Sequence, residues 1–297
     1  MEKRIITIDE LYQNPPISTS DLMRIYKTDD HKILKVFKEY DDISSVFKEN
    51  VNHSIENGNN IYHDGCECAY DYVEKVRNIT ESKVLVADEF KLIKGVSLPE
   101  CAYYDKAGKF IGFSQPLYYY MDLYQYLRRP QNKKELCEII LKVSSIIKQC
   151  NENGINIVDL GNYTNILVGP LLEVMLIDYD DFQIGDSISF MESATFWRDD
   201  TPILSHPKYY NEKKGLITTN FDKMAMTNMA TYILFNEDII NSSSKESKEL
   251  QLKALNGEKV DYTRIQPEFR DCVNLLFNLN KDNIYPDDAI KSYMKRL

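Results

Sequence analysis

The chain has 297 residues, which is room for one large domain or for two lobes that bury a substantial core. Hydrophobic residues make up 43% of it and charged residues 28%, so the composition excludes collagen, coiled coil and wholesale disorder. With 36 basic and 46 acidic residues the formal net charge is −10, which argues against nucleic acid or an anionic membrane as a partner.

Apolar runs and cysteines indicate the cellular location. No stretch approaches the roughly 20 apolar residues of a membrane-spanning helix, and the N-terminal segment lacks the apolar run of a signal peptide. The six cysteines are scattered, and the close pair Cys66 and Cys68 lacks the second pair that a zinc site would need. We therefore expect reduced thiols in a cytoplasmic protein.

The first part of the sequence has the pattern of strands with a helical interruption. Runs rich in β-branched and aromatic residues, joined by turn residues, predict hairpins over 23–38 and 102–113. Between them, apolar residues at helical spacing predict one helix near 69–79 and a second over 82–93. Residues 40–80 are otherwise polar and rich in Asn, and we interpret them as an insertion.

After Pro116 the pattern becomes helical. Residues 134–150 carry a single apolar stripe, as an amphipathic helix does. Residues 221–235 are apolar nearly all round, which predicts a buried helix. Two more helices are expected near 269–279 and 287–296.

This order of elements predicts the fold class and the domain organisation. Strands first and helices second is typical of an α+β chain. We expect a small β-rich N-terminal lobe over residues 1–116 and a larger helical C-terminal lobe over residues 117–297.

Three polar residues beside two short predicted strands form the most informative pattern. Asp159 follows the amphipathic helix, Asn165 precedes the strand at 166–168, and Asp178 follows the strand that begins at Val174. Carboxylate and amide oxygens at the ends of adjacent strands converge, and they suit Mg²⁺, which prefers octahedral oxygen ligands. A separate Asp can orient a hydroxyl nucleophile. The pattern therefore fits phosphoryl transfer, which depends on positioning and on charge neutralisation.

These residues resemble the protein-kinase fold, and most of all the divergent bacterial eukaryotic-like kinases. The metal-binding segment of those kinases reads Ile-Asp-x-Asp-x-x-Gln, which residues 177–183 match, and the resemblance covers nearly all of the chain from about residue 17 onward. It implies that Asp159 is the catalytic-loop Asp. It also implies that Asn165 and Asp178 are the metal ligands.

The same resemblance implies an ATP site. Lys35 matches the Lys that holds the α- and β-phosphates. The glutamate that orients Lys35 is Glu89 or, on the earlier helix, Glu74. The residues implied around the base and at the hinge are Ile25, Ile33, Gln115, Tyr118 and Leu167.

The chain departs from the pattern of the family in several places. Residues 18–26 have the spacing of the glycine-rich loop but contain no Gly. Ile157 and Val158 stand where the family has His and Arg, so docking of an activation-loop phosphate is not expected to switch the protein on. Residues 201–208 resemble the end of an activation segment, with Lys208 in place of the usual Glu.

Further expectations concern the residues around the implied catalytic loop. Asp222 matches a buried Asp that braces the backbone of that loop. The loop is one residue longer than usual, so Asn162 could compete with Asn165. Among the neighbouring acids, Asp180 is the best spare metal ligand.

The resemblance implies a phosphotransferase that depends on ATP and Mg²⁺. A Ser/Thr protein kinase that lacks the His-Arg pair is the leading hypothesis, with a nucleotide and a protein substrate as partners. A pseudokinase that uses the fold only for binding is the first alternative, because the glycines, the His and the Arg are missing. The second is a kinase of small molecules, since Asp-x-Asp after the second strand also occurs in aminoglycoside and choline kinases.

Overall fold

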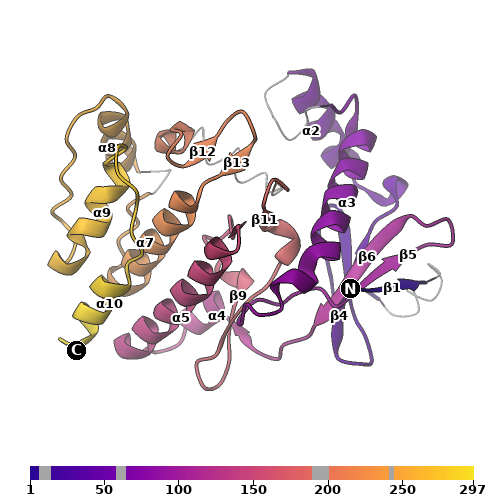
Figure 1. Ribbon diagram of the computed structural model, residues 1–297, viewed down its shortest axis with the longest axis horizontal. Helices are drawn as coiled ribbons and strands as arrows, with labels where there is room; N and C mark the ends of the chain where they lie inside the picture. The colour runs from indigo at the N-terminus through magenta and orange to yellow at the C-terminus, as the bar shows by residue number, and fades with distance from the viewer. Residues whose placement is uncertain (7–14, 58–64, 189–200, 241–243) are drawn as a thin grey trace. The chain divides into compact units, whose positions relative to one another are not determined.

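The chain is described by a computed structural model, which places residues 1–6, 15–57, 65–188, 201–240 and 244–297. It divides into two compact units, Met1–Tyr119 and Tyr120–Leu297. The first unit contains the large sheet and the second is mainly helical, so the expected α+β class is confirmed (Figure 1).

The first unit is built on a six-stranded sheet. Its strands are β1 Glu2–Ile5, β2 Ser18–Thr19, β3 Met23–Lys27, β4 Lys32–Phe37, β5 Cys101–Tyr104 and β6 Phe110–Pro116. They lie in the order β1-β5-β6-β4-β3-β2, with β1 parallel to β5 and the other pairs antiparallel. Both expected hairpins are present, as β3–β4 and β5–β6. The strands β4 and β6 lie in the interior of the sheet and pair on both sides.

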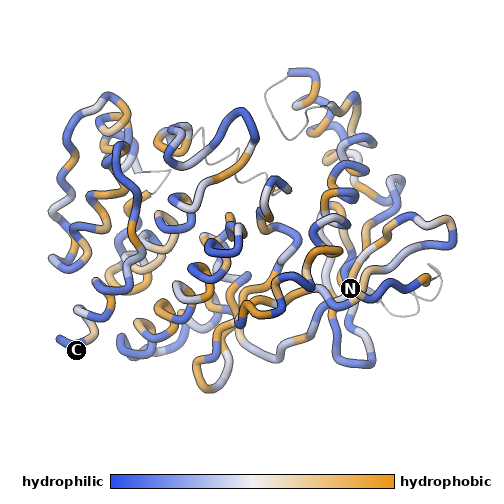
Figure 2. Tube along the Cα trace, viewed as in Figure 1, coloured by the Kyte–Doolittle hydropathy of each residue, from blue (hydrophilic) through white to orange (hydrophobic). Residues whose placement is uncertain are grey.

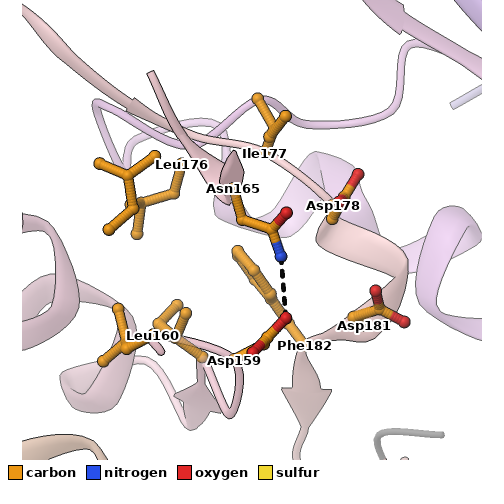
Figure 3. Close-up of a pocket in the computed structure, with 10 residues that line it drawn as sticks. Asp159, Leu160, Asn165, Leu176, Ile177, Asp178, Asp181 and Phe182 are labelled. Atoms are coloured by element: carbon orange, nitrogen blue, oxygen red, sulfur yellow. Dashed lines mark hydrogen bonds between the residues drawn. The ribbon is translucent and has the colours of Figure 1, made fainter. Parts of the chain in front are cut away.

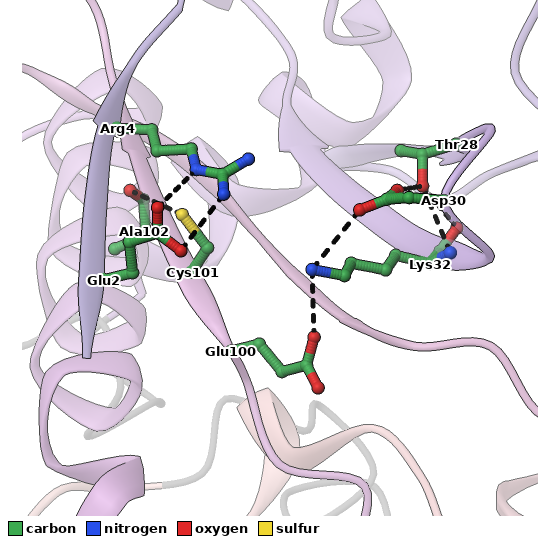
Figure 4. Close-up of polar contacts among 8 residues, drawn as sticks. All are labelled: Glu2, Arg4, Thr28, Asp30, Lys32, Glu100, Cys101 and Ala102. Atoms are coloured by element: carbon green, nitrogen blue, oxygen red, sulfur yellow. Dashed lines mark hydrogen bonds and ion pairs between the residues drawn. The ribbon is translucent and has the colours of Figure 1, made fainter.

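Side chains of the β3–β4 turn close it. The Lys32 N–H donates to Thr28 Oγ1 at 3.1 Å, and the Thr28 N–H donates to the Lys32 carbonyl at 3.0 Å. Lys32 Nζ lies 3.3 Å from the Asp30 carboxylate and 3.2 Å from that of Glu100 (Figure 4). Exposed ion pairs contribute about 0–1 kcal/mol, so these pairs orient the turn rather than hold the sheet together.

Two helices follow β4. The helix α2 spans Ser45–Glu56 and lies within the polar insertion, where the sequence did not predict it. Its N-cap is Ser44, whose Oγ accepts from the Phe47 N–H at 3.2 Å. The helix α3 spans Ala69–Val86.

The prediction of a separate helix over 82–93 is wrong. One helix, α3, runs on to Val86, and the 3-10 turn η3 (Ala87–Phe90) follows it. No Gly or Pro stands in the middle of this segment to end the helix. Thr80 and Val84 are both buried, so the inward-facing stripe of the helix continues without a break.

The two faces of the sheet are covered differently. Leu34 and Val36 of β4 belong to an apolar cluster whose members are Tyr26, Leu34, Val36, Cys101, Tyr103 and Ile111. On the other face, the Arg77 guanidinium of α3 lies 5.1 Å from the centre of the Phe37 ring and donates to the Phe110 carbonyl at 3.3 Å. Because side chains two apart in a strand share a face, α3 covers the face of Lys35 at its Phe37 end.

The second unit contains six helices within its described residues. They are α4 Leu123–Leu127, α5 Lys133–Glu152, α7 Thr219–Phe235, α8 Lys245–Leu255, α9 Arg270–Phe277 and α10 Asp287–Met294. Its short strands are β7 Met121–Asp122, β8 Ile155–Asn156, β9 Ile166–Val168, β10 Val174–Leu176, β11 Gln183–Ile184, β12 Tyr210–Asn211 and β13 Leu216–Ile217. The helices expected after Pro116 are confirmed, whereas α8 was not predicted.

The helices α5 and α7 form the centre of this unit. They pack on each other, and α10 packs on α5. The apolar stripe of α5 is buried, and hydrophobic and hydrophilic residues alternate around the helix (Figure 2). The helix α7 is buried on most of its sides, as its composition predicted. No described helix is both long and apolar enough to cross a bilayer.

Candidate active site

Short elements of the second unit bring the three predicted polar residues to one pocket. Asp159 lies just after β8, Asn165 ends the 3-10 turn η4 (Tyr163–Asn165), and Asp178 comes shortly after β10. The strands β9 and β10 are antiparallel neighbours, which brings the last two residues close. The lining residues are Ile157, Asp159, Leu160, Asn165, Ile166, Leu176, Ile177, Asp178, Asp181 and Phe182 (Figure 3).

Asp159 is the acid at the centre of this pocket. Figure 3 shows its side chain and that of Asn165 pointing toward each other, and Asn165 Nδ2 donates to Asp159 Oδ2 at 3.1 Å. Burial raises the pKa of Asp159 to about 6, against hydrogen bonds from Asn162 and Asn165, and the charge of Asp178 adds to the rise. A carboxyl with its midpoint near neutral pH is suited to exchange a proton.

Asp178, which lines this pocket, and Val158, next to it in sequence, both have a left-handed backbone. The described chain has five non-glycine residues with positive φ, and they include Val158 at 61° and Asp178 at 63°. This conformation is strained, most of all for a β-branched residue such as Val. Strained backbone persists only where the surroundings hold it, and it gathers at functional sites.

Asp222 braces the backbone beside Asp159. It lies in the first turn of α7, is fully buried, and accepts from the Ile157 N–H at 3.0 Å and the Val158 N–H at 3.3 Å. Asn151 Nδ2 donates to it at 2.7 Å. Burial raises the pKa of Asp222 to about 6, and these hydrogen bonds oppose the rise. The expectation that Asp222 holds the loop is confirmed.

The residues next to the predicted ligands are arranged differently from expectation. Asn162 is exposed and caps η4, where its Oδ1 accepts from the Thr164 N–H at 3.3 Å, so Asn165 alone of the two lines the pocket. Asp181 lines the pocket, whereas Asp180 does not. Asp180, which we expected as the best spare metal ligand, therefore lies outside the lining of this pocket.

The spacing of the two acids in the chain carried a signal for Asp181. The 3-10 turn η5 (Tyr179–Asp181) directly follows Asp178. Such a turn has three residues per revolution, so side chains three apart fall on one side. Asp178 and Asp181 are three apart, and a prediction of this turn would have found the second acid.

Lys35 is a buried residue in the interior of the first unit's sheet. It is 6% exposed and lies on β4, which pairs with β3 and β6. Its register partners are Ile25 and Phe113, and Lys35 Nζ lies 5.8 Å from the centre of the Phe113 ring. Lysines are almost never this deeply buried unless they are paired. Most lysines in strands are solvated and lie at the edge of a sheet, whereas Lys35 is buried in its interior.

The two glutamates considered as partners of Lys35 lie in different surroundings. Glu89 is exposed and lies on η3 rather than on a helix. Glu74 lies on α3, with its carboxylate 3.5 Å from Arg77 Nε and 3.1 Å from Lys109 Nζ. The buried polar side chains of α3 are Arg77, Thr80 and Lys83, none of which is an acid.

The segment that matches a glycine-rich loop is a tight turn between β2 and β3. The Ser20 N–H donates to the Met23 carbonyl at 2.9 Å, and the Met23 N–H donates to Ser20 Oγ at 3.1 Å. Lys38 pins the turn from the end of β4, because its N–H donates to the Leu22 carbonyl at 2.8 Å and its Nζ to the Ser20 carbonyl. The turn therefore keeps its own polar groups occupied.

The remaining predicted contacts with the base lie in both units. Ile33 is half-buried on β4, and the register places it on the face of Lys35. Tyr118 is half-buried and follows β6. Leu167 is half-buried on β9 opposite Met175, and it does not line the pocket of Asp159.

The donor set of the pocket fits a magnesium ion. Asp178 and Asn165 provide a carboxylate and an amide oxygen, and Mg²⁺ is usually bound by one or two carboxylates together with water and substrate phosphates. Among the described residues no three His, Cys, Asp or Glu side chains are grouped to hold an ion. A magnesium ion held by Asp178 and Asn165 would therefore complete its coordination with water or with substrate oxygens.

No protein-family model matches the chain, and neither does any curated protein.

Proposed function

We propose that the protein is a phosphotransferase with a protein-kinase-like, two-lobed fold, which uses ATP and Mg²⁺ to phosphorylate Ser or Thr hydroxyls of a protein. The observation that carries this proposal is the pocket that unites Asp159, Asn165 and Asp178, which come from three separate segments in the expected order. No disulfide joins cysteines of the described residues, in keeping with a cytoplasmic location.

In this proposal each polar side chain of the pocket has one role. Asp159 orients the acceptor hydroxyl and takes its proton, for which a pKa of about 6 is well suited. Asp178 and Asn165 hold Mg²⁺, which neutralises charge on the phosphates. Asp222 keeps the backbone before Asp159 in place through its two N–H contacts.

The first unit contributes the nucleotide contacts. Lys35 neutralises the α- and β-phosphates. Its burial in the middle of a sheet sets Lys35 apart from ordinary surface lysines and supports a specific role for it. Ile25 is its register partner and Ile33 lies two residues away on the same strand, so both present apolar surface on the face of Lys35.

The test is transfer of label from γ-labelled ATP to the protein itself and to a generic Ser/Thr substrate. Asp159→Ala should fold normally and lose transfer by about 100-fold or more, the usual contribution of a positioned acid or base. Asp180→Ala is the matched control, because this acid lies beside the pocket without lining it, and its transfer should be within a few-fold of wild type. Equal labelling of Asp159→Ala and wild type would contradict the proposal.

A pseudokinase that binds nucleotide or a partner without turnover is the second candidate. Two observations favour it. The turn that matches the glycine-rich loop is pinned by Lys38, and Glu74 of α3 lies beside Arg77 and Lys109. Binding of Mg-ATP in calorimetry, with no label transferred by wild type under any metal, would favour this candidate over the enzyme.

A further inference from the structure

Tyr285 lies on the segment 278–286, which connects α9 to α10, and it contacts both central helices of the second unit. Its hydroxyl donates to Asn151 Oδ1 in the last turn of α5. Lys148 Nζ, also of α5, lies 4.9 Å from the centre of the Tyr285 ring, and Lys223 Nζ of α7 lies 5.7 Å from it. Because a cation is attracted to an aromatic ring, both helices help to fix the position of this tyrosine.

The same segment holds the first turn of α7. Asn220 Nδ2 donates to Asp282 Oδ1 at 2.8 Å, and the Asn283 N–H donates to Asn220 Oδ1 at 2.8 Å. Asn283 Nδ2 donates to the Asn220 carbonyl at 2.9 Å. Asn220 and Asp222 lie together in this turn. The segment therefore joins the end of α5 to the beginning of α7.

A chain of hydrogen bonds leads from Tyr285 to the backbone beside Asp159. Asn151, which accepts from Tyr285, donates through Nδ2 to the Asp222 carboxylate at 2.7 Å. Asp222 in turn accepts from the two backbone N–H groups that precede Asp159. One of these belongs to Val158, whose φ of 61° is held only as long as its surroundings hold it. Tyr285 is the outer end of this chain.

The hydroxyl of Tyr285 is the donor that orients the Asn151 amide. Burial raises the pKa of Tyr285, and the charges of Asp222 and Asp287 add to the rise, so the hydroxyl keeps its proton at neutral pH. Among the residues that the structure describes, no other group donates to Asn151 Oδ1. Removal of the hydroxyl would therefore leave this acceptor without its partner and free the amide to turn.

We infer that Tyr285 is a positioning residue, which acts through Asn151 and Asp222 to fix the backbone that carries Asp159. It thereby sets the direction from which the Asp159 carboxylate meets the acceptor hydroxyl. This inference rests on the proposed function and adds to it a residue from the C-terminal part of the chain. Catalysis is sensitive to such positioning, because a misplacement of about 1 Å can cost about 100-fold in rate.

The experiment measures label transfer from γ-labelled ATP by Tyr285→Phe, which removes the hydroxyl and keeps the ring. The kcat should fall about 10-fold while the KM for ATP stays within about twofold, because the phosphate and metal contacts are assigned to other residues. Tyr285→Phe should cause no further fall in an Asn151→Ala background, since members of one hydrogen-bond network are not additive.

Tyr293→Phe is the matched control. The hydroxyl of Tyr293 accepts from Lys133 Nζ at 3.3 Å, at the other end of α5, so this change removes a comparable contact that leads away from Asp159. Its kcat should be within about twofold of wild type. All variants are assayed well below their own melting temperatures, so that loss of the fold is not counted as loss of catalysis.

Amide hydrogen exchange provides a readout that does not depend on turnover. The N–H groups of Ile157 and Val158 donate to Asp222, and they should exchange faster in Tyr285→Phe than in wild type. In Tyr293→Phe they should exchange as in wild type.

The outcomes separate this inference from the proposed function. If wild type transfers label and Tyr285→Phe transfers it at the same rate, the role of Tyr285 is wrong and the phosphotransferase stands. The role is also wrong if the two amides exchange as in wild type, or if Tyr285→Phe causes its full loss again in the Asn151→Ala background. If wild type transfers no label, the proposed function fails, and a role of Tyr285 in catalysis fails with it.

Discussion

Two buried carboxyl groups, those of Asp159 and Asp222, have similarly raised pKa values but different roles. Burial raises the pKa of both Asp159 and Asp222 to about 6. Asp222 accepts hydrogen bonds from two backbone N–H groups and from the Asn151 amide. These bonds offset the cost of burying its carboxylate and hold the loop in place. Asp159 lines the pocket, where hydrogen bonds from Asn162 and Asn165 lower its pKa and the charge of Asp178 raises it. A buried carboxyl with a raised pKa beside a second acid is expected where function, rather than folding, selects the residue.

Replacing Asp159 by Asn should stabilise the metal-free protein at neutral pH. The folded pKa of Asp159 lies above the unfolded value of 3.8, so the folded state favours the protonated form. The stability from this preference is complete below pH 3.8 and is lost as the pH rises through about 6. The ionised carboxylate then costs at most about 3 kcal/mol. Urea unfolding of Asp159→Asn and wild type should differ most above pH 7 and converge toward pH 4.

The control for this prediction is an acid outside the pocket. Asp186 is 82% exposed at its side chain and pairs with Lys214 at 3.1 Å. Asp186→Asn should leave the free energy of unfolding within about 0.5 kcal/mol of wild type, as surface substitutions usually do. Asp222 is present in every variant, so its own titration cancels in the comparison. A gain for Asp159→Asn that is the same at pH 4 and pH 7.5 would show that the carboxyl is not held in a desolvated site.

At the scale of elements, Lys208 links two segments of the second unit. Its Nζ donates to the Leu275 carbonyl at 2.6 Å and to the Asn278 carbonyl at 3.1 Å, at the C-terminal end of α9. A cation there is favourable, because helix C-termini carry partial negative charge and unpaired carbonyls. The lysine therefore ties the segment around residue 208 directly to helix α9.

Substitutions of Lys208 test this anchor. Lys208→Met should lower the free energy of unfolding by about 1–3 kcal/mol, because two hydrogen bonds from a charged group are lost in a buried place. Lys208→Glu should be worse, since a carboxylate would face the carbonyls. Lys245→Met provides the control, because that side chain is 92% exposed. Equal stability of Lys208→Met and wild type in urea unfolding would contradict the anchoring role.

The elements that could be predicted are those with a strong local pattern. The helix α5 was predicted nearly in full because its apolar stripe is regular. The helices α2 and α8 were not predicted, because each buries few side chains and its composition is mostly polar. Local spacing also sufficed to predict that Asp159, Asn165 and Asp178 lie close together, because they come from one short stretch of sequence. The surroundings of Glu89 and Glu74 depend on how helices pack, which spacing alone does not determine.

At the scale of the whole molecule, the proposed function assigns roles to residues of both compact units. Lys35 belongs to the first and Asp178 to the second. Mg-ATP at 100 times its dissociation constant should stabilise wild type by about 2.7 kcal/mol. Lys35→Met and Asp178→Asn should each lose most of this stabilisation in calorimetric unfolding, while Lys3→Met, an exposed change on β1, should keep it. If Lys35→Met keeps the full effect and Asp178→Asn loses it, the second unit alone binds the nucleotide, and the role assigned to Lys35 is wrong.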